Sequence, residues 1–185
     1  MNKIKLALLV TGALFAGSNA FAAADATAVE RGTVKFIGEL TDETCSIVAG
    51  DENQTVTLPK LSTNIIGKAG DKGGWTRFTI KVEKCSDTVK EVAAHFEGNG
   101  FGSVDQTTGF LLNQSATGSQ NVRIAIRNKV GATKDDDMIQ IGGTGQYFKT
   151  ADKKAVLAYE GGYYAVGATT PGPVTATTMY TLAYK

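Results

Sequence analysis

Histidine, proline and tryptophan are scarce in this chain of 185 residues, which contains one, three and one of them respectively. A lone histidine gives no histidine pair for zinc, and no Gly-x-Ser-x-Gly motif is present to indicate a hydrolase. That residue, His95, is next to the apolar Phe96 in a strand-like stretch. Because neighbouring side chains in a strand point to opposite faces, we expect the His95 ring to point out of the sheet, away from the core. The glycine-rich run Glu97–Gly102 lacks the Lys-Ser/Thr and the helix of a phosphate-binding loop, and it indicates a hairpin turn. The sequence therefore predicts a protein that is not an enzyme, with no catalytic residue, no metal site and no cofactor.

Neither sign of charge is in excess, because 19 basic residues balance 18 acidic ones. This balance argues against nucleic acid or an anionic membrane surface as a partner. The one acidic run, Lys134–Asp137, is compensated by its own lysine. We interpret it as a solvated turn rather than a metal site, since no other ligand cluster is near in the sequence.

Long hydrophobic runs are absent after residue 22, so no later stretch predicts a transmembrane helix. Residues 1–22 have the features of a secretory signal: Lys3 and Lys5, the apolar core Leu6–Phe15, and the small-x-small triplet Ala20-Phe21-Ala22. We expect cleavage after Ala22, with Ala20 as the alternative. The exported chain would then have 163 residues with 17 basic and 18 acidic side chains, which suits one domain.

The chain has two cysteines, Cys45 and Cys85. Export implies an oxidising compartment, where such a pair usually forms a disulfide. The bridge would close a loop of about 40 residues, and the chain-entropy model gives it roughly 4 kcal/mol. Two free buried thiols are the alternative, whereas a catalytic thiol would need a thiolate that a paired cysteine lacks.

Alternation of apolar and polar residues with a period of two dominates the rest of the chain and predicts strands separated by glycine-rich turns. Many short strands with regular turns indicate one antiparallel sandwich or barrel. The predicted turns include 70–74, 98–102, 142–145 and 161–162. The predicted strands are Thr33–Leu40, Thr55–Leu58, Arg77–Glu83, Glu91–Glu97, Phe110–Asn113, Val122–Asn128, Ala155–Tyr159, Gly162–Val166 and Val174–Tyr184.

The two ends of the exported chain carry the most specific patterns. Before the first cysteine, residues 23–28 are small or polar and have no clear preference for a secondary structure. The chain then becomes strand-like, with Gly32, Val34 and Phe36 on one face. A flexible N-terminus is the alternative reading of this stretch. At the other end, one mostly apolar face continues over 13 residues, or roughly 43 Å at the rise of a strand. It consists of Gly172, Val174, Ala176, Thr178, Tyr180, Leu182 and Tyr184.

These patterns together resemble the chaperone–usher pilins, especially the major subunits of type 1-like fimbriae. Four motifs in order carry the resemblance, which covers nearly the whole exported chain but does not place Trp75. They are Gly32-Thr33-Val34-Lys35-Phe36 with Gly38 ahead of Cys45, Val56-Thr57-Leu58-Pro59, Phe78–Val82 leading to Cys85, and Gly172 fourteenth from the end with penultimate Tyr184.

The resemblance implies an incomplete immunoglobulin-like sandwich that lacks its last strand, formed by residues 38–185. Its groove would lie beside the C-terminal strand, and residues 23–37 would be the extension that completes the groove of a neighbouring subunit, with Gly32, Val34 and Phe36 facing it. A periplasmic chaperone would first lend a strand and grip the terminal carboxylate of Lys185, and an outer-membrane usher would then exchange it. The implied partners are other pilin subunits in a homopolymer and tip adhesin or adaptor subunits, and the implied location is a surface fimbrium that supports adhesion.

Two other interpretations remain open at this point. A minor adaptor or terminator pilin would share most of these motifs. A secreted monomeric carbohydrate-binding sandwich could use Tyr159, Tyr163 and Tyr164 as a sugar platform, although we expect these rings in or beside the core.

Overall fold

The computed structural model describes residues 32–38, 40, 44–128 and 137–185. The chain divides into two compact units, Met1–Glu39 and Leu40–Lys185. The predicted signal at 1–22, the first part of the predicted extension and most of the acidic run lie outside the described residues. In the first unit, residues 32–38 have no strand assignment.

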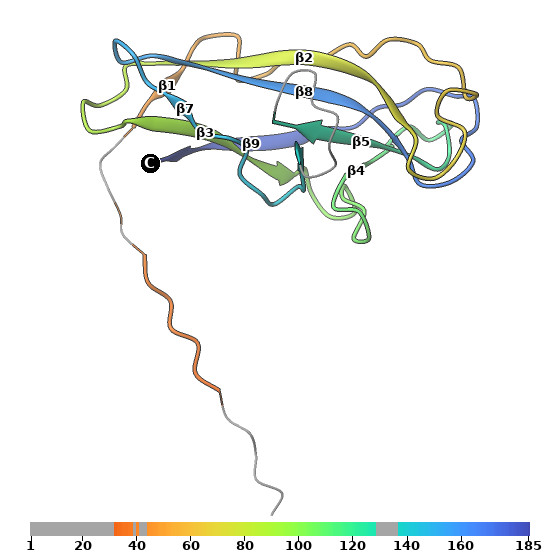
Figure 1. Ribbon diagram of the computed structural model, residues 1–185, viewed down its shortest axis with the longest axis horizontal. Coiled ribbons are helices and arrows are strands. Elements are labelled where there is room, and N and C mark those ends of the chain that lie inside the picture. The colour runs from red at the N-terminus through yellow and green to blue at the C-terminus, as the bar shows by residue number, and fades with distance from the viewer. Residues whose placement is uncertain (1–31, 39, 41–43, 129–136) are drawn as a thin grey trace, which may run out of the picture. The chain divides into compact units, whose positions relative to one another are not determined.

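The larger sheet of the second unit is antiparallel and mixes long and short strands. Its two longest strands, β2 and β8, are neighbours in its centre (Figure 1). The order is β1 (Ser46–Ile47), β2 (Lys72–Glu83), β8 (Ala155–Ala165), β5 (Val122–Arg127) and β4 (Leu111–Leu112), with β6 (Met138–Ile139) also paired to β5.

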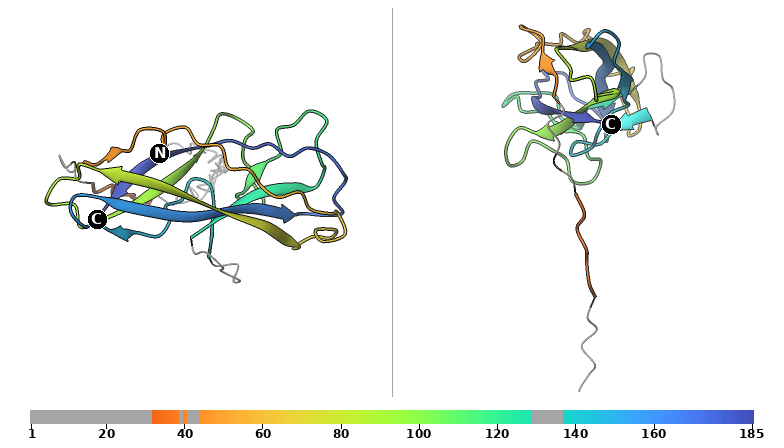
Figure 2. Two further views of the ribbon diagram at one scale, coloured as in Figure 1. Left: turned by 90° about the horizontal axis from the view of Figure 1, so that it is seen from above. Right: turned by 90° about the vertical axis from the view of Figure 1, so that its left-hand side faces the viewer.

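The smaller sheet has the order β7 (Phe148–Lys149), β3 (Glu91–Gly98) and β9 (Thr178–Tyr184), again antiparallel. Figure 2 gives two further views of these strands. The described residues form no α-helix, and none of them belongs to a helix that could span a membrane. The predicted all-β class is therefore confirmed.

The core lies between the two sheets and is centred on Tyr159 of β8, whose side chain is fully buried. Its ring meets those of Phe96, Phe148 and Phe78 at centroid distances of 5.1, 5.7 and 5.9 Å. The inward residues follow the predicted alternation. They include Ile80 and Val82 of β2, Val92 and Ala94 of β3, Ile126 of β5 and Leu157 of β8.

The structure corrects the prediction of a turn at residues 161–162, because both glycines lie inside the single long strand β8. A side chain at Gly162 would collide with the ring of Trp75, since a Cβ there would lie 2.5 Å from it. The glycine therefore makes room for tryptophan rather than for a turn.

Two predicted strands are not assigned as strands. Residues 55–58 keep the expected alternation, with Val56 and Leu58 half-buried and Thr55 and Thr57 exposed, but they pair with no strand in the described part of the chain. The described residues of Thr33–Leu40 are likewise unassigned. An extended segment becomes part of a sheet only when a neighbour supplies hydrogen bonds, and neither segment has one here.

Candidate functional site

The last strand, β9, lies at the edge of the smaller sheet. It pairs with β3 along its whole length, and no strand among the described residues pairs with its other side. An uncovered edge presents unpaired main-chain donors and acceptors to any added strand. This edge coincides with the strand that the sequence predicts as the acceptor.

The pairing with β3 shows which main-chain groups of β9 are free. Glu91 and Lys185 exchange two hydrogen bonds, of 3.1 and 3.0 Å. Hydrogen-bonded pairs alternate with non-bonded pairs in an antiparallel ladder. In this register, Thr181 and the other odd-numbered residues therefore bond to β3. The N–H and C=O groups of the even-numbered residues, such as Tyr180 and Leu182, point to the open side.

The same even-numbered residues turn their side chains inward. Tyr180, Leu182 and Tyr184 pack against the core cluster but stay only partly buried, whereas Met179 and Thr181 are exposed. The alternation includes Thr178 at the start of β9 and continues upstream of the strand, where Val174 and Ala176 are also half-buried. The even-numbered residues are thus half-buried from Val174 to Tyr184, whereas Gly172, the first residue of the predicted face, is exposed.

The upstream part of this segment pairs with a loop rather than with a strand. The carbonyl oxygen of Thr175 accepts the N–H of Gln114 at 2.8 Å, and its N–H donates to the side chain of Asn113 at 3.0 Å. One of the two bonds thus comes from a side chain, which explains why the strand begins at Thr178 and not at the predicted Val174. Gly172 has a φ of +156°, and a Cβ there would lie 2.6 Å from the main-chain nitrogen of Ser119.

A cleft of about 700 Å³ adjoins this upstream part. It lies between residues 60–66 and the segment that leads into β9. Its apolar lining comprises Leu61, Ile66, Val122, Tyr163, Pro171, Pro173 and Val174. The open edge therefore continues into a mostly apolar hollow at its N-terminal end.

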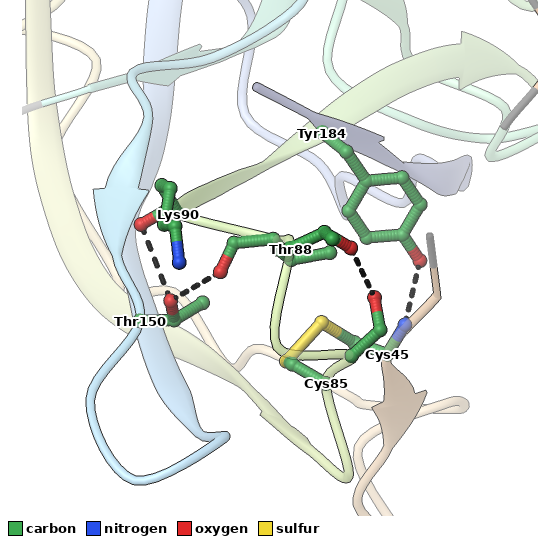
Figure 3. Close-up of a disulfide and its surroundings, with 8 residues drawn as sticks. Cys45, Cys85, Thr88, Lys90, Thr150 and Tyr184 are labelled. Atoms are coloured by element: carbon green, nitrogen blue, oxygen red, sulfur yellow. Dashed lines mark hydrogen bonds between the residues drawn. A yellow bond between two sulfur atoms is a disulfide. The ribbon is translucent and has the colours of Figure 1, made fainter. Parts of the chain in front are cut away.

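The disulfide lies at the opposite end of β9 (Figure 3). Cys45 and Cys85 are joined, and the described residues contain no free cysteine. The main-chain N–H of Cys45 donates to the hydroxyl of Tyr184 at 3.0 Å. Lys185 is exposed, with its Nζ 5.0 Å from the centre of the Tyr147 ring. The main chain of Cys45 thus contacts the predicted acceptor strand directly, which the position of Cys45 in the sequence does not indicate.

The predicted donor residues belong to the first unit. Val34 and Phe36 have apolar side chains that are 76% and 90% exposed. A Cβ at Gly32 would meet no heavy atom within 4 Å. No described neighbour therefore requires a glycine at this position.

The histidine considered for catalysis and the tyrosines considered for sugar binding make contacts within the fold. His95 is half-buried on β3, and its Nδ1 lies 2.8 Å from the hydroxyl of Thr144. Tyr159 is buried in the core, while Tyr163 and Tyr164 are half-buried, with Tyr164 in edge contact with Phe110. The three tyrosines therefore do not form an exposed sugar platform.

Comparison with known proteins places these features in one family. The fimbrial protein family matches residues 32–185, and this chain belongs to that family. It is a structural fimbrial subunit of the type 1-like class.

Individual relatives support the same assignment. The F17 fimbrial protein of Escherichia coli is 36% identical over 178 residues, covering 91% of this chain and 96% of that protein. The type-1 fimbrial protein A chain of E. coli K12 is 33% identical, covering 99% and 100%. Among solved structures, the P pilus rod subunit PapA has a TM-score of 0.57 at 19% identity, covering 76% of this chain and 99% of PapA, which shows a shared fold.

Proposed function

We propose that this subunit polymerises by donor-strand exchange, in which residues 23–37 of one copy complete the sandwich of the next. The main support for this proposal is the open edge of β9. There the even-numbered residues have both unpaired main-chain groups and partly uncovered side chains that pack on the core. An added strand would satisfy the main-chain groups and cover the side chains at once.

A second wall for the groove is supplied by residues 52–59. Asp51 on one side of this segment bonds to Tyr180 of β9, and Lys60 on the other side lines the same cleft as Val174. Between them, Val56 and Leu58 alternate as in a strand but have no strand neighbour among the described residues. A strand inserted between this segment and β9 would give both a partner.

The extension has the pattern that such a groove requires. In an extended conformation Gly32, Val34 and Phe36 share one face, and the two larger side chains are exposed. A glycine facing the groove would let the two main chains approach closely. Thr33 and Lys35 on the other face are polar, as expected for a face that turns to solvent.

The proposal includes the assembly route. An open apolar groove costs about 25 cal/mol per Å² of exposed apolar surface and invites aggregation. A periplasmic chaperone would cover it before an outer-membrane usher passes the subunit into a surface fimbrium. Because the chain carries both an extension and an acceptor edge, we assign it to the homopolymeric shaft. We assign it no catalytic role because its relatives are fimbrial proteins.

The test compares thermal unfolding of residues 38–185 alone and with a synthetic peptide of residues 23–37. We expect the peptide to raise the Tm strongly. A Gly32→Leu peptide should lose the effect because leucine would hold the two main chains apart. A Thr33→Leu peptide adds the same bulk on the opposite face and should stabilise like the unchanged peptide.

Two outcomes would contradict the proposal. A stable domain that ignores the peptide would mean that the sandwich is complete by itself. Equal loss with the Gly32→Leu and Thr33→Leu peptides would mean that Gly32 does not face the groove. In cells, Gly32→Leu should reduce fimbriation while leaving the monomer folded.

A further inference from the structure

Two tyrosine side chains of β9 reach across the interior to the opposite sheet, along the open side of the sandwich. The hydroxyl of Tyr184 accepts the N–H of Cys45 at 3.0 Å, and the hydroxyl of Tyr180 donates to the carbonyl oxygen of Asp51 at 2.8 Å. Cys45 and Asp51 lie on either side of β1, which belongs to the larger sheet. Each tyrosine therefore links β9 to the main chain that flanks β1. We call Tyr180 and Tyr184 the tyrosine struts.

The far end of each strut is held independently. Cys45 is tied by its disulfide to Cys85, and the carbonyl oxygen of the residue before it accepts the N–H of Ser86 at 2.9 Å. Asp51 is tied to β2, because its carboxylate accepts the N–H of Lys81 at 2.8 Å. Each hydroxyl thus meets a point that cannot shift without breaking other bonds.

The near ends lie on the strand that would receive the donor. Tyr180 and Tyr184 are even-numbered residues of β9, whose main-chain groups face the open side and whose side chains pack on the core cluster. They are four residues apart, or about 13 Å along a strand, and Leu182 lies between them. The struts therefore fix the position of β9 relative to the larger sheet at two points along the groove.

We infer that Tyr180 and Tyr184 are positioning residues for strand addition, and this inference rests on the proposed function. A groove with apolar walls lowers its free energy by closing over its own exposed surface. Hydroxyls bonded across the interior hold the walls at a fixed separation. An incoming strand then meets a groove that is already open for binding. Its apparent affinity for the groove is therefore not lowered by a population of molecules with closed grooves.

The variants Tyr180→Phe and Tyr184→Phe test this, because each removes one hydroxyl and keeps the ring. The matched control is Tyr164→Phe. The Tyr164 ring also makes an aromatic contact, with Phe110, but its hydroxyl makes no hydrogen bond within the described residues. Binding of a fluorescent peptide of residues 23–37 to the full mature chain is followed by anisotropy, at concentrations where self-assembly is slow.

We expect each strut variant to associate with the peptide about three- to tenfold more slowly than the unchanged chain, the factor that one lost hydrogen bond carries. Dissociation of the formed complex should change less, because the added strand then holds the walls itself. The Tyr164→Phe chain should stay within about twofold of the unchanged rate. Amide exchange should also quicken at Cys45 in Tyr184→Phe and stay slow there in Tyr180→Phe.

The outcomes separate this inference from the proposed function. If the unchanged chain does not bind the peptide, donor-strand exchange itself is wrong. If it binds, and the strut variants associate at its rate although Cys45 exchanges faster in Tyr184→Phe, only the positioning role is overturned. Slowing of Tyr164→Phe to the same extent also overturns it. Should Tyr184→Phe fail to fold, Tyr180→Phe carries the same test, since its hydroxyl does not contact the disulfide.

Discussion

The hydroxyl of Tyr159 makes a buried bridge whose removal has a predictable cost. The residue is fully buried, and its hydroxyl accepts the N–H of Ala94 at 3.0 Å and donates to the carbonyl oxygen of Gln146 at 3.3 Å. Ala94 is itself fully buried on β3. Its N–H thus has a side-chain acceptor in place of a strand partner.

The change Tyr159→Phe keeps the ring in the aromatic cluster and removes only this bridge. The N–H of Ala94 would then be buried without an acceptor, which costs about 1–3 kcal/mol. We expect the free energy of unfolding at pH 8 to fall by that amount. Urea unfolding of the monomeric mature chain, followed by circular dichroism, measures it.

A second signature appears at high pH. Burial raises the pKa of Tyr159 from 10.0 to about 12, with the nearby Tyr147 adding to the rise and the hydrogen bond from Ala94 opposing it. The unfolded chain therefore releases this proton near pH 10, whereas the folded chain keeps it until about pH 12. The stabilisation is complete below pH 10 and is lost as the pH rises to 12, by up to about 2.7 kcal/mol for two pKa units.

The phenylalanine chain has no such proton to lose, so the stability difference between the two chains should shrink between pH 10 and 12. Burial also raises the pKa of Tyr163 and Tyr180, but both are present in the two chains and cancel in the difference. A difference that stays constant from pH 8 to pH 12 would refute the raised pKa. Equal stability at pH 8 would refute the buried bridge.

Two further changes test the disulfide and the packing of Trp75. Replacing both Cys45 and Cys85 by alanine should lower the free energy of unfolding by about 4 kcal/mol, because the bridge closes a separation of 40 residues. Denaturant midpoints with and without the change measure this, and an unchanged midpoint would contradict it. Gly162→Ala places a Cβ 2.5 Å from the Trp75 ring and should cost about 1–3 kcal/mol while shifting the fluorescence of the chain's one tryptophan. Gly161→Ala is its control, since a Cβ there meets nothing within 4 Å, and an equal loss in both would show that Trp75 is not the cause.

Much of the sandwich follows from period-two alternation. The pattern places Ile80 and Val82 on the inner face of β2 and Val122, Ile124 and Ile126 on one face of β5, as the structure has them. Alternation indicates the face of a residue but not its partner. Short strands such as β1 and β6 have only two residues, too few for a period to be seen.

Contacts made across the sheets could not be predicted in the same way. The outward row of β5 and β8 contains a buried ion pair between Arg127 and Glu160, with the guanidinium 4.0 Å from the centre of the Trp75 ring. Arg127 and Glu160 are directly opposite each other in the pairing of β5 with β8. Because the register depends on the whole sheet, no local spacing in the sequence brings them together.

The candidate site shows the same division. The apolar face that includes Val174, Tyr180 and Tyr184 can be predicted from the sequence because it repeats every second residue. The hydrogen bonds from the two tyrosine hydroxyls to the main chain of Cys45 and Asp51 cannot be predicted, since a main-chain partner can belong to any residue type. The cleft beside Val174 likewise arises from loops that alternation does not describe.

The alternation along β9 also determines which of its residues can be substituted without changing the core. Tyr180, Leu182 and Tyr184 pack their side chains on the core and direct their main-chain groups to the open edge. Met179 and Thr181 bond to β3 through their main chains and expose their side chains, of which only that of Thr181 also bonds to β3, at Glu97. Substitutions at those two positions would change the exposed face of the strand while leaving both the core and the open edge unchanged. One strand can therefore vary its outer face freely while its inner face stays constrained.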